Sequence, residues 1–478
     1  MSMYDIVIIG AGITGTVLAR ELARYDLKIA LIDKENDIAC GATMANSAIV
    51  HTGYDPEDGT MMAKLNPEGC RLYEQLCNET GCCYRVTGAF IAACGEEEEK
   101  HLDILAERAD KRGIEYRFLD GNAARGIEPA LSDDVTKVLD FYTTAVIYPW
   151  EVAIACAEVA VRNGMELYLN SPCTGIGRTE GGYIVHTPGK DLECKLVVNA
   201  AGVYAEEIAK MVSEQVRFHI TPRRGEYYVL DDTAQPVQHI IFPVPSKEKG
   251  KGVLAVPTVH GNTLLGPSSD VIDSLDDNGT STEGLGYVKK NIYKLLKDPM
   301  LYRSIRTFAG LRPSSNVRDF VIEEAPDAEG FINASCIESP GIASAPAIAK
   351  YIVSELISKR LELNEKPGAD LTRKPPIVMR TLTPEQRTEL IMKDPAYGRM
   401  ICRCCQVSEG EIVACIHSIC GARTVKGVKK RTGPGFGRCQ GGFCEPLVVG
   451  ILARELGCDP TEIVLDSAKS KILESENR

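Results

Sequence analysis

Short apolar runs and glycine turns alternate at the start of the chain. Residues 4–9 contain four consecutive apolar positions, as expected of a buried strand. A helical pattern follows over residues 13–25, and residues 27–32 have the character of a second strand. Strand, helix and strand in this order predict a βαβ unit.

Later segments mix two kinds of strand. Residues 227–230, 252–256 and 263–265 have the pattern of antiparallel strands, whereas residues 196–199 and 331–333 look like buried strands. A helix is expected over residues 345–361. The predicted fold is α/β, with a Rossmann-like nucleotide-binding domain and an α+β domain built on an antiparallel sheet.

Composition narrows the class of protein. The chain has 478 residues, enough for two or three domains, and its formal charge of −12 argues against a nucleic-acid binder. The first apolar run is too short for a secretory signal, and no apolar stretch reaches the ~18 residues of a membrane helix. We therefore expect a cytoplasmic protein without direct membrane insertion. Any association with a membrane would come through a partner.

The first glycine turn has the spacing of a dinucleotide-binding loop. The first glycine permits a tight turn, the second lets the backbone approach a pyrophosphate, and the third allows close packing of helix and strand. An acidic residue follows the second strand, where it can accept hydrogen bonds from a ribose. The residues expected to bind the cofactor here are Gly10, Gly12, Ile13, Thr14, Gly15, Asp33 and Lys34. This motif alone does not separate NAD from FAD.

Cysteines are concentrated near the end of the chain. Eight of 18 follow residue 401, and in a reducing compartment such clusters indicate metal ligands. Cys402-x-Cys404 and Cys439-x4-Cys444, separated by 34 residues, can hold a 2Fe–2S cluster. Tetrahedral zinc is the alternative that four cysteines leave open.

Three further cysteines and a basic run accompany these pairs. Cys405 could exchange with Cys404 as a ligand, whereas Cys415 and Cys420 are expected to be buried thiols. The basic run from Lys426 to Arg438 has two interpretations. It forms a solvated surface, or it offsets the negative cluster and guides a partner.

Several segments resemble the glycine/D-amino-acid oxidase-like flavoproteins. They are residues 40–53, 199–202, 310–313 and 341–344, and the resemblance spans residues 1–360. It implies FAD as the cofactor, with Asp33 in place of the more usual glutamate. The further residues it implies at the cofactor are Thr43, Asn46, Ser47, Cys173, Ala201, Gly202, Gly310, Gly341, Ile342, Ala343 and Ser344.

Two branches of that group fit best. Residues 46–53, 224–228 and 264–267 resemble L-2-hydroxyglutarate dehydrogenases. The whole layout, with its cysteine module, resembles the large subunit of anaerobic glycerol-3-phosphate dehydrogenases. Residues 437–444 are similar to the bacterioferritin-associated ferredoxin-like domain, which predicts a small helical iron–sulfur domain with Cys402, Cys404, Cys439 and Cys444 as ligands.

The expected domain organisation follows from these motifs. A flavin oxidoreductase domain occupies residues 1–363, with its FAD part at about 1–75, 145–215 and 305–363. Its substrate part covers about 76–144 and 216–304. A linker at 364–394, the iron–sulfur domain at 395–458 and a tail at 459–478 complete the chain.

The candidate catalytic residues are His51, Arg224, Tyr227 and Arg312. An arginine fork suits a carboxylate or a phosphate, and a histidine can accept the hydroxyl proton during alcohol oxidation. His51 is a candidate for this base or for a hydrogen bond to the flavin, which the resemblance places beside it. His260 is a second candidate base, although its setting suggests an exposed turn. Tyr227 and Tyr228 alternate on a strand, so one of them should face the pocket. The helix that begins after Gly341 could direct its dipole at the reduced flavin.

The sequence thus predicts an FAD-dependent dehydrogenase acting on a small anionic hydroxy substrate. Glycerol 3-phosphate and an L-2-hydroxy acid such as L-2-hydroxyglutarate are the expected substrates. Electrons would pass through a 2Fe–2S cluster to a redox partner, either a second flavoprotein subunit or a quinone-linked protein. An amino-acid or amine dehydrogenase and a non-catalytic electron-transfer subunit stay open as alternatives.

Overall fold

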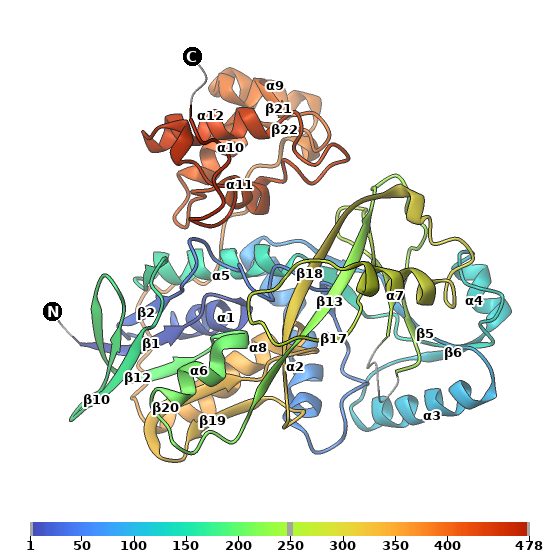
Figure 1. The fold of residues 1–478 in the computed structure, drawn as a ribbon, viewed down its shortest axis with the longest axis horizontal. Coiled ribbons are helices and arrows are strands. Elements are labelled where there is room, and N and C mark those ends of the chain that lie inside the picture. The colour runs from blue at the N-terminus through green and yellow to red at the C-terminus, as the bar shows by residue number, and fades with distance from the viewer. Residues whose placement is uncertain (1–2, 246–251, 476–478) are drawn as a thin grey trace.

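The computed structural model describes residues 3–245 and 252–475. Two sheet-based parts lie side by side in Figure 1, and a helical C-terminal module (red and orange) sits above the N-terminal one. The long strands β13 (Ile220–Leu230) and β18 (Ser304–Ser315) pair with each other and run between the two parts. The described part of the chain contains no helix long and apolar enough to cross a membrane.

The first part is built on a mainly parallel sheet of eight strands. Its path is β10-β11-β12-β1-β2-β9, with β20 beside β12 and β19 beside β20. The strands are β1 (Tyr4–Ile9), β2 (Ile29–Ile32), β9 (Glu166–Tyr168), β10 (Gly175–Thr179), β11 (Gly182–His186), β12 (Asp191–Asn199), β19 (Val321–Ala325) and β20 (Ala328–Ser335). The expected βαβ unit is present, because β1 and β2 pair in parallel around a helix.

Helices cover both faces of this sheet. They are α1 (Ile13–Leu22), α2 (Met61–Thr80), α5 (Pro149–Arg162), α6 (Ala205–Lys210) and α8 (Gly341–Tyr351). The largest apolar core lies between the sheet and α1, α5 and α8. Two helix predictions were wrong at their ends: the first helix stops at Leu22, and α8 starts four residues before residue 345 and passes into a π-helical turn, Ile352–Leu356, and a 3-10 turn, Ile357–Lys359.

The second part is built on a nine-stranded, largely antiparallel sheet. Its path is β17-β13-β16-β15-β14-β5-β7-β6, with β18 beside β13. The remaining bounds are β5 (Ala89–Ala93), β6 (Arg117–Asp120), β7 (Lys137–Asp140), β14 (Ile240–Pro243), β15 (Leu254–Pro257), β16 (Thr263–Gly266) and β17 (Asp270–Val271). This arrangement agrees with the predicted antiparallel domain.

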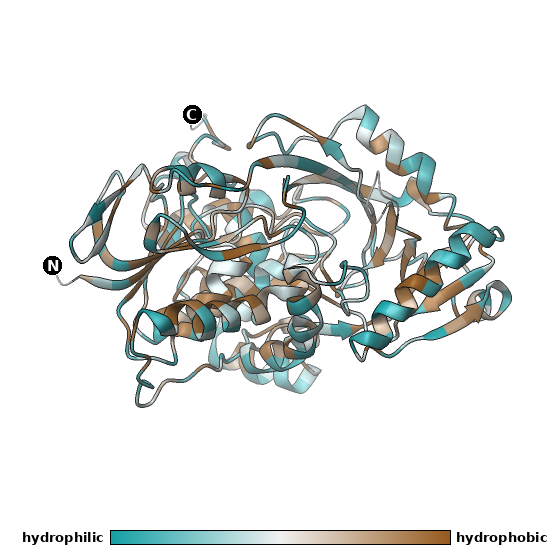
Figure 2. Ribbon diagram, turned by 90° about the horizontal axis from the view of Figure 1, so that it is seen from below, coloured by the Kyte–Doolittle hydropathy of each residue, from teal (hydrophilic) through white to brown (hydrophobic). Residues whose placement is uncertain are grey.

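Three helices, α3 (Glu96–Lys111), α4 (Gly121–Ile127) and α7 (Thr282–Ile292), flank this sheet. Helix α3, at the right of Figure 2, carries both hydrophobic and hydrophilic residues, and its buried residues are leucines and alanines. A small sheet of β3 (Ile49–Val50), β8 (Ala145–Ile147) and β4 (Tyr84–Val86) joins the two parts. The third sheet of the structure is thus separate from the two large sheets.

The segment after residue 363 lies against the first part. The backbone N–H of Lys366 donates to the Arg24 carbonyl at 2.7 Å, and that of Arg373 donates to the Glu79 carbonyl at 2.8 Å. The range predicted as a linker also contains a helix, α9 (Pro384–Lys393), whose N-terminus is closed by a capping box at Thr383. The connection is thus fixed to the body over part of its length.

The C-terminal module is small and mainly helical, as predicted. It comprises the hairpin β21 (Met400–Cys402) and β22 (Val407–Ser408), followed by α10 (Glu409–Ile416), α11 (Val425–Thr432) and α12 (Glu445–Leu456). Short 3-10 turns also occur along the whole chain. Besides Ile357–Lys359, they are Gly202–Tyr204 and Leu301–Arg303 before the C-terminal segment, and Met379–Thr381, Pro395–Gly398 and Pro460–Glu462 within it. The module has its own apolar core.

Candidate functional site: a flavin cavity beside a cysteine cluster

The first glycine turn has the geometry that its sequence predicts. Gly10 has φ +111°, and a Cβ placed on it would lie under 3.0 Å from the Ala200 carbonyl oxygen. A Cβ on Gly15 would overlap the Gly10 carbonyl, so this third glycine lets α1 pack closely on β1. Thr43 Oγ1 accepts the Ile13 N–H at 2.9 Å and fixes the loop that faces the turn.

Asp33 lies at the carboxyl end of β2, beside the same turn. Its carboxylate accepts the Ala11 N–H at 2.6 Å and the Glu35 N–H at 2.9 Å. Burial raises the pKa of Asp33, and these two N–H groups oppose that rise. The next residue, Lys34, places its ammonium 3.7 Å from the centre of the Tyr204 ring. A carboxylate in this position is suited to bind ribose hydroxyls.

A single cavity of about 1420 Å³ extends from this turn between the two sheet-based parts. Most of the predicted cofactor and catalytic residues line it. They are Gly10, Gly12, Ile13, Thr14, Asp33, Lys34, Thr43, Asn46, Ser47, His51, Cys173, Ala201, Gly202, Tyr227, Gly310, Arg312, Gly341 and Ile342. The structure therefore brings together segments that lie more than three hundred residues apart, 10–14 and 310–342 among them.

Four predicted residues are not among the described residues that line the cavity: Gly15, Arg224, Ala343 and Ser344. Gly15 packs helix against strand, and Ala343 packs its backbone against Gly69 of α2. Ser344 is fully buried and donates to the Pro340 carbonyl at 3.0 Å. Gly15, Ala343 and Ser344 thus support the cavity wall, and their contact with a cofactor stays a prediction.

Arg224 also lies elsewhere than expected. Its guanidinium is 2.7 Å from Asp277 and 3.2 Å from Glu226, which is fully buried. Two carboxylates thus compensate its charge. These contacts favour a structural role for Arg224, and its role in binding the substrate stays a prediction.

Arg312 and Tyr227 form the polar end of the cavity. Arg312 Nη2 donates to the Ser268 carbonyl at 3.0 Å, and Tyr227 Oη lies 3.0 Å from Ser47 Oγ. Burial raises the pKa of Tyr227, and the positive charge of Arg312 opposes the rise. A Cβ on Gly225 would lie under 3.0 Å from Arg312 Nη2, so the glycine opens the space that the guanidinium occupies. This cationic end is built for a small anion.

The strand β13 decides which tyrosine faces the cavity. Tyr227 lines it and stacks on Phe308 at 4.7 Å between ring centres. Tyr228 packs on the opposite face against α7, with its hydroxyl 3.4 Å from the Leu285 carbonyl. Successive side chains of a strand point to opposite faces of the sheet, so only one of the two tyrosines can face the cavity. The packing of β13 makes this residue Tyr227.

His51 is buried at the cavity wall. Its imidazole lies 5.3 Å from the Phe242 ring, and its backbone carbonyl accepts the Asn66 side-chain N–H at 3.0 Å. His260 lies in the turn between β15 and β16 and packs edge-on against Tyr148, outside the residues that line the cavity. His51 is therefore the histidine placed to act on a ligand.

The helix α8 directs its N-terminus at the cavity. Pro340 precedes the helix, and Gly341 and Ile342 form part of the cavity wall. A helix N-terminus carries a partial positive charge and free N–H groups. It can stabilise negative charge on the pyrimidine side of a flavin.

The four predicted ligand cysteines gather at one place in the C-terminal module. Cys404 Sγ lies 3.8 Å from Cys439 Sγ, which matches the ~3.8 Å between two sulfurs on one tetrahedral metal with bonds of about 2.3 Å. Hydrogen bonds from the thiols of Cys405 and Cys444 lower the pKa of Cys402. The sulfurs are thus arranged as two pairs, as a two-iron cluster requires.

Backbone N–H groups surround these sulfurs. The N–H groups of Gly441 and Phe443 lower the pKa of Cys439 against the opposing effect of burial. Cys444 is the N-cap of α12, and its hydrogen bond with the Cys402 sulfur and its burial raise the pKa of its thiol. Among the described residues, no three His, Cys, Asp or Glu side chains converge on a single-ion site. Cys405 also contacts Cys402 and thus lies close to the candidate ligands. That Cys405 could replace Cys404 as a ligand stays a prediction.

The C-terminal module closes the cavity, which the sequence did not predict. Lys429, Phe436, Gln440 and Cys444 all line it. Phe436 stacks on Trp150 of α5 at 6.0 Å, and Arg306 of β18 donates to Gln440 Oε1 at 3.2 Å. The one feature of the sequence that pointed to a contact of this module was the basic run at 426–438. One cluster ligand therefore borders the same space as the nucleotide turn.

Comparisons with known proteins define the class. The chain belongs to the FAD dependent oxidoreductase family, whose model matches residues 5–355, and residues 400–454 match the BFD-like 2Fe–2S binding domain. The glycine turn, the buried carboxylate and the helix N-terminus fit FAD, and the paired sulfurs fit the cluster. The protein is thus a flavin enzyme with FAD and a 2Fe–2S cluster as cofactors.

The relatives identify the branch. A "Glycerol 3-phosphate dehydrogenase" from Caloramator mitchellensis is 44% identical over 98% of both chains. A "Glycerol 3-phosphate oxidase" from Mycoplasma genitalium is 30% identical and covers 78% of this chain and all of its own. The FAD-bound L-alpha-glycerophosphate oxidase structure from Mycoplasma pneumoniae superposes with a TM-score of 0.75 at 27% identity, covering 79% of this chain and 100% of that one. The chain is therefore a homologue of glycerol-3-phosphate dehydrogenases.

Proposed function

We propose that the protein oxidises the secondary alcohol of glycerol 3-phosphate with FAD and passes the electrons outward through its 2Fe–2S domain. The observation that carries this proposal is one cavity bordered by the nucleotide turn, by Arg312 and by the ligand Cys444. The relative that is similar over 98% of both chains carries the dehydrogenase name. Substrate and flavin would then share one cavity, with the cluster at its border.

Bound FAD would supply the oxidant of this reaction, an acceptor for the hydride of the alcohol carbon. Arg312 binds the phosphate through charge-assisted hydrogen bonds. Tyr227 and Ser47, whose oxygens are 3.0 Å apart, orient the substrate next to it. His51 accepts the proton of the hydroxyl that is oxidised. The N-terminus of α8 stabilises the negative charge left at the cofactor.

The C-terminal domain points to a dehydrogenase, because an enzyme that delivers electrons to oxygen needs no cluster. A one-electron carrier at the cavity lets the two electrons leave singly to another protein. We expect this acceptor to be a second flavoprotein subunit or a quinone-linked protein. We expect the protein to work in the cytoplasm, with contact to a membrane only through that partner.

An anaerobic screen of the purified protein tests the proposal. Glycerol 3-phosphate, L-2-hydroxyglutarate, L-lactate and glycine are added in turn while the flavin and cluster absorption are followed. Glycerol 3-phosphate should bleach both, and the reduced cluster should give a rhombic paramagnetic signal at low temperature. Bleaching by glycine or by a 2-hydroxy acid, with none by glycerol 3-phosphate, would transfer the proposal to another substrate class. Failure of all four compounds would favour a non-catalytic electron-transfer subunit.

A further inference from the structure

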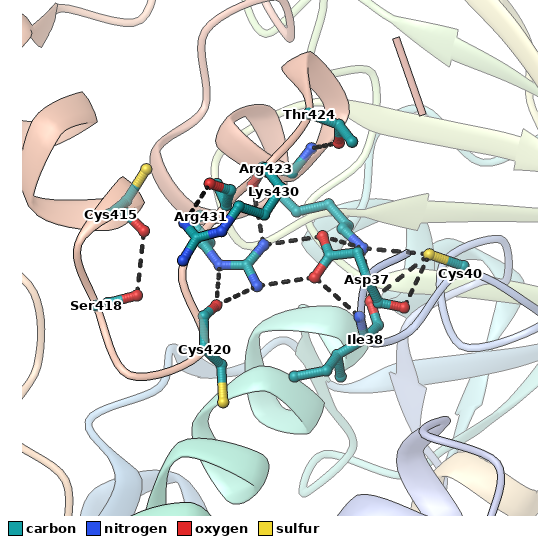
Figure 3. Close-up of polar contacts among 12 residues, drawn as sticks. Asp37, Ile38, Cys40, Cys415, Ser418, Cys420, Arg423, Thr424, Lys430 and Arg431 are labelled. Atoms are coloured by element: carbon teal, nitrogen blue, oxygen red, sulfur yellow. Dashed lines mark hydrogen bonds and ion pairs between the residues drawn. The ribbon is translucent and has the colours of Figure 1, made fainter. Parts of the chain in front are cut away.

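Three charged side chains are buried where the C-terminal module meets the FAD domain (Figure 3). Asp37 comes from the loop after β2, and Lys430 and Arg431 come from α11. Asp37 lies 2.8 Å from the Lys430 ammonium, and its two oxygens accept from Arg431 at 2.8 and 2.9 Å. The exposed fractions of these side chains are 7%, 1% and 6%. We call these three residues the interdomain ion cluster.

The remaining hydrogen-bonding capacity of the cluster is also used. Lys430 Nζ donates to the Ile38 carbonyl at 2.5 Å and lies 3.6 Å from Cys40 Sγ. Arg431 donates to the Cys420 carbonyl. Burial alone would raise the pKa of Asp37, but the charges of Arg431 and Lys430 lower it to about 2. A buried ion pair is retained only when its geometry and hydrogen bonds are this complete.

The loop that holds Asp37 is part of the cofactor site. Its neighbours on both sides, Glu35 and Cys40, line the cavity. The Ala39 N–H donates to the Ala11 carbonyl at 3.0 Å, inside the first glycine turn. Movement of α11 therefore acts on the same backbone that receives the dinucleotide.

The charge balance favours an anionic cofactor. One carboxylate opposes two cations, so the cluster holds one excess positive charge (−1 + 2 = +1) in a buried position. Low local dielectric extends the reach of such a charge. The diphosphate of FAD is the anion expected beside the glycine turn.

We propose that the interdomain ion cluster couples FAD binding to docking of the iron–sulfur domain. Docking holds the loop at 35–40 in its binding conformation, and bound FAD in turn holds the domain so that Cys444 borders the cavity. Asp37, Lys430 and Arg431 are thus positioning residues that act on FAD through this loop. The proposal assumes that electrons pass from the flavin to the cluster, but the coupling itself needs no substrate.

A single tryptophan reports on docking. Trp150 is the one tryptophan of the chain, and its ring stacks on Phe436 of the docked module at 6.0 Å with planes 18° apart. Undocking would expose Trp150 to water. Its emission would then shift to longer wavelength and become more accessible to acrylamide.

The experiment compares Asp37→Asn, Lys430→Met and Arg399→Met in the full-length holoprotein. Arg399 is the matched control: it is a largely exposed cation of the same module, paired with Glu409 within that module. FAD release is followed by the rise of flavin fluorescence after dilution, and docking by acrylamide quenching of Trp150. FAD release and Trp150 quenching are both measured without substrate, so neither result depends on which substrate the protein oxidises.

Asp37→Asn and Lys430→Met should each weaken FAD binding by about tenfold or more and expose Trp150. Trp150 also lines the cavity, so its quenching in each variant is compared with that in the unaltered protein at saturating FAD in both. Arg399→Met should leave both readouts unchanged. Lys430→Met keeps a balanced pair of Asp37 and Arg431, so it carries the test if Asp37→Asn fails to fold. FAD affinity that stays within twofold, or that falls with no change at Trp150, would overturn the proposal.

Discussion

Removal of the Arg312 guanidinium tests the proposed anion site most directly. The side chain is half-buried and held by the Ser268 carbonyl, so solvent screens it little. Two charge-assisted hydrogen bonds to a phosphate, at about 1.5 kcal/mol each, amount to about 3 kcal/mol. Arg312→Ala should therefore lower kcat/KM for glycerol 3-phosphate by about 150-fold.

Steady-state kinetics with an artificial acceptor measures this effect, and FAD absorption confirms that the cofactor is retained. Arg312→Lys keeps the charge but loses the planar fork, so a smaller loss of about tenfold is expected. Gly225→Ala should act in the same direction, because its Cβ would displace the Arg312 guanidinium. The matched control is Arg224→Ala, which removes the partner of buried Glu226 and should lower the melting temperature without raising KM. Unchanged kcat/KM in Arg312→Ala would refute the assignment of the anion site.

The other predictions concern the cluster, the tyrosine and pH. Cys439→Ser should abolish the cluster signal and electron transfer to the acceptor, while substrate still bleaches the flavin. The control Cys458→Ser should leave the cluster signal and the transfer unchanged. Loss of flavin bleaching in Cys439→Ser would mean that the cluster is also structural. Tyr227→Phe removes the hydroxyl that meets Ser47 and should lower kcat/KM about fivefold, with an intact flavin spectrum; wild-type kinetics would exclude its role. Because the pKa of Asp37 is lowered to about 2 in the folded state, its contribution to stability, about 2 kcal/mol, is present above pH 4 and lost as the pH falls towards 2. Acrylamide quenching of Trp150, measured as the pH is lowered from 4 to 2, should therefore rise in the wild type and not in Asp37→Asn. Identical pH profiles of the two proteins would contradict this role of Asp37.

Local motifs predicted the cofactors well for a physical reason. The glycine turn and the cysteine pairs act through backbone conformation and short spacing, and both are properties of a few adjacent residues. Gly10 needs a positive φ wherever the rest of the chain lies. The cysteines were found because thiolates so closely spaced have few other uses in a reducing compartment.

The sequence did not distinguish the surroundings of two arginines that looked alike. Arg224 precedes Gly225 and Arg312 precedes Pro313, yet Arg224 pairs with two carboxylates while Arg312 lines the cavity. The difference arises from pairing between β13 and β18, strands about ninety residues apart. A sequence does not state which carboxylate a guanidinium will meet.

The basic run of the C-terminal module shows the same limit. Its two interpretations were a solvated surface and a guide for a partner, but Lys430 and Arg431 are buried against Asp37 of the same chain. The ion pair joins residues 394 positions apart. Burial of that kind is decided only when two domains dock.

The amino-acid sequence by itself determined that this protein carries a flavin and a cluster of iron and sulfur, since each is held by a short motif whose geometry is local. Tertiary structure alone decided that the glycine turn and Cys444 border one cavity, that Arg312 and Tyr227 face it, and that a buried ion cluster joins the two domains. These features depend on which distant surfaces exclude water from one another. Only the packed chain specifies those surfaces.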